Sequence, residues 1–310
     1  MLDFSHLTDN PNVNIQSFFG DSDAATNLTD WKVWTKPRGV KWVYMIAVGA
    51  GASGAGGTFT GASAASAGAA GGASGAQSTV LIPAIFVPNT LFIQTGLGGR
   101  QGTAITSALA SVNGTPTYIS VEPFSTLASN LVFCLGNGAT GATGGVIATA
   151  ATMPLAGKGV YSFFVGQAGG TAGATQNGAG GSVTAGTTGL MVTGGAGSGG
   201  KDVTAASRGA GGAITGAGFL STFPTLAGGT AAASGTNAGS GINGFQVTPY
   251  MFYGGSGGGS GAFAATGNGS TGSSGGNGAP GCGGGASGPG YSTTGRAGDG
   301  GDGFAYIISW

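Results

Sequence analysis

Residues 254–303 read GGSGGGSGAFAATGNGSTGSSGGNGAPGCGGGASGPGYSTTGRAGDGGDG, and this stretch decides the fold. Twenty-three of its residues are glycine, and none is valine, isoleucine, leucine or methionine. Glycine recurs at every third position from Gly269 to Gly284, and again from Gly295 to Gly301. A period of three fits neither an α-helix nor a strand, but it fits the extended three-residue helix of the polyproline II type. Because glycine has no side chain, several such helices can pack side by side and bond N–H groups to neighbouring carbonyls.

The composition of the whole chain excludes several classes of protein. Its 310 residues carry nine basic and nine acidic side chains, so the net charge is zero and neither a nucleic-acid groove nor an anionic membrane surface is indicated. The chain is 40% hydrophobic and 6% charged, whereas disordered chains are usually poor in apolar residues and rich in charge. We therefore expect a folded protein with a low-charge surface, suited to packing in a large assembly or to contact with neutral polar ligands such as glycans.

Short apolar blocks run directly into glycine-rich stretches, which start at residues 49, 96, 136, 166, 194 and 254. The intervals between these starts are too irregular for a stacked solenoid. They indicate a sheet whose strands all lead into long glycine loops on one side. The closing block from Phe304 to Trp310 is predicted to pair with the strand from Val43 to Val48, and we find no convincing amphipathic helix after residue 40. The predicted fold is all-β, an antiparallel sheet or sandwich with long glycine-rich loops packed as polyglycine II helices.

The first residues have a different composition. Residues 1–39 hold only two glycines, so we expect an N-terminal attachment segment at 1–39 and a glycine-rich β/polyglycine II domain at 40–310. The first residues lack the basic start and apolar core of a signal peptide. The most apolar window, residues 79–93, contains Pro83 and Pro88 and is too short to span a membrane. We expect a soluble protein that is not secreted by the usual route and does not insert into a membrane.

Three glycine-rich stretches spell parts of known motifs but lack the residues that the chemistry needs. The dinucleotide-type pattern at 49–54 is followed by no acidic residue for twenty positions, and the phosphate-loop pattern at 195–202 ends in Asp202 instead of serine or threonine. The nucleophile-elbow spelling at 254–258 has no base to serve it, because His6 is the only histidine. Glu122 is the only glutamate. We therefore predict no enzyme, no catalytic residue and no cofactor.

Two aspartates and two cysteines allow more than one interpretation. Residues 297–304, with Asp299 and Asp302, nearly match one calcium-binding nonapeptide, but such sites are built from tandem copies. A tight turn before the last strand is favoured, no metal site is predicted, and calcium binding is left open. Cys134 and Cys282 are favoured as unpaired thiols, although they could form a disulfide in an oxidising compartment.

Three aromatic residues, Phe59, Phe263 and Tyr291, stand alone in glycine-rich loops. Each is predicted either to cap the packed glycine helices or to offer an exposed ring to a sugar or an apolar partner. We weigh the two roles equally, and the three residues are the candidate receptor-binding residues.

The chain resembles glycine-rich bacteriophage virion proteins, particularly tail-fibre tip adhesins built on a sandwich of packed polyglycine II helices. The resemblance covers residues 31–310 and lies in the turn from Trp34 to Gly39 with the strand to Val48, in the repeated transitions from strand to glycine, and in the closing run to Trp310. In that family the glycine sandwich is a rigid scaffold, and variable loops at its tip contact a cell-surface receptor. This chain departs from the pattern by placing many apolar strands among its glycine stretches, which favours a mixed β and glycine-helix domain.

The resemblance implies a structural protein at the virion surface, assembled in the host cytoplasm. Its function would be host attachment through a tail fibre or spike. The implied partners are other virion proteins, reached through the N-terminal segment, and a host receptor that is a glycan or an outer-membrane protein; no nucleic acid is implied. A capsid decoration or vertex protein is the alternative. An ice-binding protein is a weaker alternative. Flat arrays of three-residue glycine helices can present regular rows of threonine, but the spacing of threonine in this chain is irregular.

Overall fold

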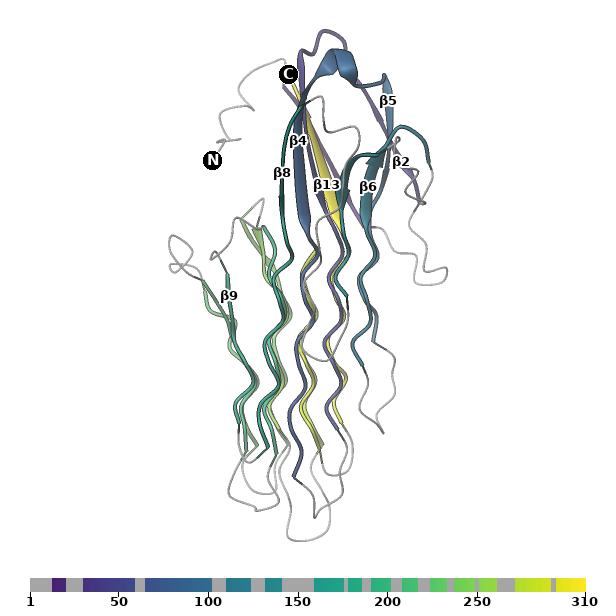
Figure 1. Cartoon of the computed structure of the whole chain (residues 1–310). Helices are drawn as coiled ribbons and strands as arrows, with labels where there is room; N and C mark the ends of the chain where they lie inside the picture. The colour runs from purple at the N-terminus through teal and green to yellow at the C-terminus, as the bar shows by residue number, and fades with distance from the viewer. Residues whose placement is uncertain are drawn as a thin grey trace.

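Strands form one end of the molecule and glycine-rich rods form the other (Figure 1). The structure is a computed structural model, and it describes residues 13–20, 30–58, 65–101, 110–123, 132–140, 159–175, 178–185, 191–201, 208–216, 224–232, 237–248, 251–260, 271–290 and 294–310. The only helix in these ranges is the short 3-10 turn η2 (Ala84–Phe86), and none is long and apolar enough to cross a membrane. The prediction of an all-β fold is confirmed.

The larger sheet has five strands in the order β1-β13-β3-β4-β8, with every neighbouring pair antiparallel. The predicted pairing of the closing strand with the strand that ends at Val48 is confirmed, since Phe304 lies opposite Val48 and Ser309 opposite Val43. The strand bounds are β1 (Asn14–Phe19), β13 (Phe304–Ser309), β3 (Trp42–Val48), β4 (Gln77–Pro83) and β8 (Val160–Phe164).

The second sheet has four antiparallel strands, and the two sheets enclose the main hydrophobic core. Alternate residues of β3, namely Val43, Met45 and Ala47, join this core, as the period of two in a strand requires. From the second sheet, Leu91, Ile93 and Ile119 meet them. The bounds are β2 (Lys32–Thr35), β5 (Thr90–Gln94), β6 (Thr117–Ser120) and β7 (Val132–Gly136).

Two small strand pairs belong to neither of these sheets, although Phe252 of one pair packs on the outer face of the five-stranded sheet. β9 (Val183–Ala185) pairs with β10 (Ile214–Gly216) in the parallel sense, and β11 (Gln246–Thr248) pairs with β12 (Met251–Phe252) in the antiparallel sense. The apolar run before residue 194 is not a strand in its described part, because Met191 to Thr193 form no ladder. Instead, Val192 is buried under the outer face of the five-stranded sheet.

The boundary expected at residue 39 does not coincide with an edge of the folded body. β1 and β2 both precede it, and each is hydrogen-bonded into one of the two sheets. Residues 13–20 and 30–39 are therefore part of the sandwich. An attachment role for the N-terminal region stays a prediction, and residues 1–12 and 21–29 lie outside the described residues.

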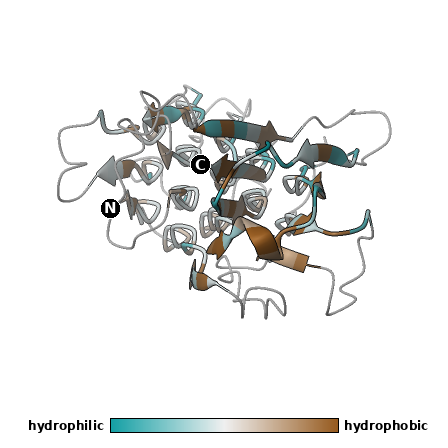
Figure 2. Ribbon diagram, turned by 90° about the horizontal axis from the view of Figure 1, so that it is seen from above, coloured by the Kyte–Doolittle hydropathy of each residue, from teal (hydrophilic) through white to brown (hydrophobic). Residues whose placement is uncertain are grey.

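The remaining described chain consists largely of extended runs that we call the glycine segments, and together they form the glycine bundle. They run in one direction away from the sheets in Figure 1 and appear end-on, side by side, in Figure 2. Many of the segments come in pairs between two strands, as 49–58 and 65–76 do between β3 and β4, so one segment runs outward and the next runs back. The segments are residues 49–58, 65–76, 95–101, 110–116, 137–140, 166–175, 178–182, 193–201, 208–213, 226–232, 237–245, 253–260, 271–280, 281–290 and 294–303.

Hydrogen bonds between glycine segments repeat every third residue, as the sequence predicts. In segment 49–58, the N–H groups of Gly49, Ala52 and Ala55 donate to segment 65–76. In the first two triplets the next residue, Ala50 or Ser53, donates to segment 110–116, and the third, Gly51 or Gly54, donates to segment 294–303. Segments 95–101, 137–140 and 281–290 donate in turn to carbonyls of segment 49–58. One segment therefore has six hydrogen-bonded neighbours, an arrangement that three-residue helices allow and a flat sheet does not.

Glycine is required where two segments touch. A Cβ atom placed on Gly195 would lie 2.1 Å from the carbonyl oxygen of Gly284, and one placed on Gly72 would lie 2.1 Å from that of Ala52. A carbon atom cannot approach a backbone oxygen so closely, and the oxygen cannot move without breaking its own hydrogen bonds. The glycine spacing is thus a packing requirement.

Serine completes the hydrogen bonding in several antiparallel segment pairs. Ser198 donates its N–H to the carbonyl of Ala69, and its hydroxyl oxygen accepts the N–H of Ala69 at 2.7 Å. Ser53 with Val112 and Ser256 with Ile242 repeat this reciprocal arrangement. The hydroxyl thus satisfies an N–H group that would otherwise be buried without an acceptor.

Candidate binding groove

One flank of the glycine bundle carries polar side chains at every third residue. They belong to segments 237–245, 271–280, 294–303 and 95–101, which lie next to one another. Asn243 Oδ1 accepts the N–H of Asn277 at 2.8 Å, Asn277 Oδ1 accepts that of Asp299 at 2.9 Å, and Asp299 Oδ1 accepts that of Gln101 at 2.7 Å. Each outward N–H group is thus bonded by a side chain of the neighbouring segment. We call this series of contacts the side-chain relay.

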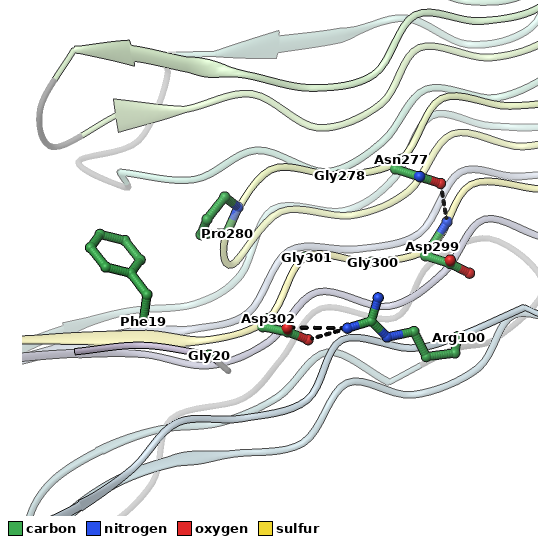
Figure 3. Close-up of a pocket in the computed structure, with 10 residues that line it drawn as sticks. All are labelled: Phe19, Gly20, Arg100, Asn277, Gly278, Pro280, Asp299, Gly300, Gly301 and Asp302. Carbon is green, nitrogen blue, oxygen red and sulfur yellow. Dashed lines mark hydrogen bonds and ion pairs between the residues drawn. The ribbon is translucent and has the colours of Figure 1, made fainter. Parts of the chain in front are cut away.

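The relay ends beside a groove of about 270 Å³, where the bundle meets the five-stranded sheet (Figure 3). The end of β1 forms one border of the groove through Phe19 and Gly20. Segments 271–280 and 294–303 supply the floor, where glycine leaves the backbone uncovered by side chains, and Arg100 forms the opposite border. A groove of this size is smaller than the usual pocket for a drug-sized ligand, so it fits a single small ring.

Asp302 is the most firmly held acidic side chain of the groove. Its Oδ1 accepts the N–H of Gly98 at 2.8 Å, and both carboxylate oxygens accept from Nη2 of Arg100, at 2.9 and 3.1 Å (Figure 3). Gly20 packs against this side chain, and a Cβ at position 20 would lie 2.3 Å from the Cβ of Asp302. Glycine at the end of β1 therefore makes room for the carboxylate.

Asp299 is held in the same way by different donors. Its Oδ1 belongs to the side-chain relay, and its Oδ2 accepts from Arg296 Nη2 at 2.7 Å. The two aspartates of the calcium-like pattern thus bind arginine and backbone N–H groups, inside a glycine segment instead of the predicted tight turn. Among the described residues, no group of three or more potential ligands is placed to hold a metal ion.

The groove also has an apolar side. Phe19 is 36% exposed, and its ring stacks on that of Phe304 with a centroid separation of 5.8 Å. Tyr306 and Phe252 meet the Phe19 ring edge-on. These contacts fix the ring orientation, and Pro280 extends the apolar surface nearby (Figure 3).

The three receptor-binding candidates, Phe59, Phe263 and Tyr291, all lie outside the described residues. The glycine segments that lead to them are described. Segments 49–58, 253–260 and 281–290 each start beside a strand or a turn at the sheet end and lead away from it. Their far ends belong to one region, which we call the distal end of the bundle, and whether the three rings cap the bundle or contact a ligand stays a prediction.

The described part of the distal end contains one fully buried cation. Lys201 bonds through its backbone to Ser66, and its Nζ donates to the carbonyl of Gly290 at 3.3 Å. Burial lowers the pKa of Lys201 to about 8, because the charged ammonium loses hydration. Nearby, Arg208 donates from Nη1 to the carbonyl of Ala232. The cations here bond to backbone carbonyls that end glycine segments.

The two cysteines are separate, buried thiols, as predicted. Cys134 donates to the carbonyl of Ser78 at 3.4 Å, and Cys282 Sγ accepts the N–H of Thr193 at 3.4 Å. Burial raises the pKa of each thiol to about 12, so neither is a thiolate near neutral pH.

The sequence drew attention to Asp299 and Asp302 through a calcium-like pattern and gave no reason to choose Arg100, Asn277 or Phe19. A usable signal was present. Polar residues recur at every third position in the series Asn237, Ser240, Asn243 and in the series Arg296, Asp299, Asp302. This spacing places the polar side chains on one side of a three-residue helix.

Neither a protein-family model nor a curated protein matches the chain. The functional proposals below therefore depend on the sequence and on the geometry of the fold.

Proposed function

We propose that the chain is a non-enzymatic bacteriophage structural protein at the virion surface that binds a host receptor as the adhesin of a tail fibre or spike. The observation that carries this proposal is the common axis of the glycine segments. They lead from one sandwich to one distal end, and in the sequence Phe59, Phe263 and Tyr291 come just after segments that lead to that end. A scaffold of this kind presents many connecting stretches to one surface.

Rigidity of the bundle supports this role. The segments are joined by backbone hydrogen bonds in several directions, so a connecting stretch starts and ends at fixed points. Fixed anchor points lower the entropy that a binding loop loses on contact with its ligand. The described surface carries few charges, which suits a neutral glycan or the exposed part of an outer-membrane protein as the receptor.

The opposite end would face the virion. Under this proposal the N-terminal region and the sandwich bind other virion proteins, and the protein assembles in the host cytoplasm. Exposed apolar side chains at this end suit such contacts, among them Trp42, Ile85 and Phe86.

The test is binding of the fluorescently labelled chain to a panel of bacterial cells and to an array of envelope glycans. We expect binding to a restricted set of strains and its reduction in Phe59→Ala, Phe263→Ala or Tyr291→Ala, with circular dichroism and melting unchanged. No binding to any strain, together with many copies per capsid, would contradict the adhesin and favour the capsid decoration or vertex protein. Inhibition of ice recrystallisation would support the weaker alternative, an ice-binding protein.

A further inference from the structure

We propose that the groove at the end of the side-chain relay binds one neutral sugar ring, at a site separate from the distal end of the bundle. The proposal does not depend on the assignment to a virion. It begins from a contrast within the groove, where an oriented aromatic ring and a set of fixed polar groups face the same small space.

The aromatic side supplies a surface for the C–H face of a sugar. Contacts with Phe304, Tyr306 and Phe252 hold the Phe19 ring on its inner side, and its 36% exposure leaves another part open to the groove. An exposed aromatic ring that is held by others loses little conformational freedom when a ligand stacks on it.

The polar side supplies both donors and acceptors. Asn277 uses its Oδ1 within the relay, and its Nδ2 has no hydrogen-bond partner among the described residues. Asp302 keeps lone pairs beyond those used by Gly98 and Arg100, and its side chain is 17% exposed. A sugar hydroxyl both donates and accepts, so adjacent hydroxyls can bond to an amide N–H and a carboxylate at once.

Charge determines which sugars fit. Asp302 is paired with Arg100 and Asp299 with Arg296, so each carboxylate in the groove is balanced by a guanidinium. A site without excess charge offers little electrostatic attraction to a carboxylated or sulfated sugar. The groove volume of about 270 Å³ limits the bound unit to one ring, and longer chains would extend along the polar flank.

The test is saturation-transfer NMR on the full chain with methyl glycosides of glucose, galactose and N-acetylglucosamine, and with N-acetylneuraminic acid as the anionic comparison. We expect saturable transfer to at least one neutral glycoside, with a dissociation constant on the order of millimolar, and weaker transfer to the anionic sugar. Phe19→Leu should weaken binding about fivefold, because an aromatic face contributes on that order. Asp302→Asn, which keeps an oxygen for the N–H of Gly98, should weaken it as well.

A matched control separates this site from others. Phe245 is 38% exposed on another part of the bundle, so Phe245→Leu should leave binding unchanged. The proposal is overturned if no neutral glycoside shows saturable transfer or if Phe245→Leu reduces binding as much as Phe19→Leu. It is also overturned if Asp302→Asn binds the sugar as well as the original chain does. If Phe19→Leu lowers the melting temperature, its binding loss is not interpreted and the test depends on Asp302→Asn. Sugar binding without binding to cells would support this site and contradict the proposed adhesin function.

Discussion

The sandwich and the glycine bundle both pair their backbone N–H and C=O groups, but they fill the space between their elements differently. In the sandwich each strand bonds to neighbours within a sheet, and large side chains such as Ile93 and Ile119 fill the space between the sheets. In the bundle a segment bonds to neighbours all around it, and a Cβ atom placed on glycines such as Gly72 and Gly195 would overlap neighbouring backbone, so these contacts exclude even a methyl group. The comparison shows that one chain can pack one part of its interior with large side chains and another part largely with backbone and small side chains. The two regions should therefore respond in opposite directions to the addition and removal of carbon atoms.

The largest effect is expected where a methyl group is added to the bundle. Gly195→Ala would place a carbon 2.1 Å from the carbonyl oxygen of Gly284, and Gly195 lies between six hydrogen-bonded neighbouring segments. We expect a loss of more than about 4 kcal/mol in the free energy of unfolding, since the clash is with backbone that cannot rearrange locally. Denaturant unfolding of the variant and of the original chain measures this loss in the free energy of unfolding. Ala172→Val, at an exposed position of segment 166–175, should change little, and equal losses in the two variants would contradict the packed bundle.

Truncation of buried side chains should lower the free energy of unfolding in the sandwich. Ile93→Ala and Ile119→Ala leave cavities in the main core, where both side chains are fully buried, and each should cost about 2–5 kcal/mol. The same denaturant experiment measures this effect. Ile242→Ala, at a side chain that is 49% exposed on the bundle, is the control. A cost at Ile242 as large as at Ile93 would show that the bundle also depends on apolar side chains.

Loss of a buried hydroxyl should have an intermediate effect. Ser198→Ala removes the acceptor of the Ala69 N–H and leaves that group without a partner, which should cost about 1–3 kcal/mol. Ser240→Ala, at an exposed position on the flank, should cost less than about 0.5 kcal/mol. Thermal melting of both variants checks the difference. A neutral Ser198→Ala would indicate that the reciprocal serine contacts are unnecessary.

Lys201 should make the stability of the bundle depend on pH. Its pKa is about 8 in the folded chain and about 10.5 when exposed, so between these values the unfolded chain binds more protons. Stability from this group therefore increases as pH rises from 8 towards 10.5, and the penalty for burying the charge is complete below pH 8. The difference in melting temperature between the original chain and Lys201→Met isolates this contribution. A difference that does not change over this range would contradict the burial of the ammonium group.

The smallest effect is expected at the thiols. Because both are buried with a pKa of about 12, neither Cys134 nor Cys282 should react with a thiol reagent in the folded chain, and both should react after denaturation. A reducing agent should leave the melting temperature unchanged. Rapid reaction of either thiol in the native chain would show that its region opens readily.

Local sequence patterns predicted much of this fold. Short apolar blocks next to glycine runs identified β3 and β13, and the glycine period of three identified the spacing of hydrogen bonds in the bundle. The pattern could not say which segments become neighbours, because a glycine contact looks the same whatever segment it meets. Ser273 illustrates the limit, since its position between glycines resembles an exposed place, yet it is buried and donates to the carbonyl of Gly259.

The candidate groove was less predictable, because a local sequence pattern does not say which segments become neighbours. It combines Phe19, Arg100, Asn277 and Asp302, which come from distant parts of the sequence and meet only because β1 pairs with β13 at the top of segment 294–303. β1 and β13 lie near opposite ends of the sequence, and no local sequence pattern indicates that they pair. The polar residues at every third position indicated an exposed flank, but the aromatic border could come only from the assembled sheet.

The repeat of three residues in the glycine segments gives the protein an adjustable length. Three added residues advance such a helix by about 9 Å and return each side chain to its former direction. If two consecutive segments each gained one triplet at the distal end, the existing hydrogen bonds would keep their partners, and the stretch that joins the two segments would move outward. Insertions in multiples of three would therefore be tolerated and insertions of one or two would not, so descendants of this chain could change their reach without redesigning the sandwich.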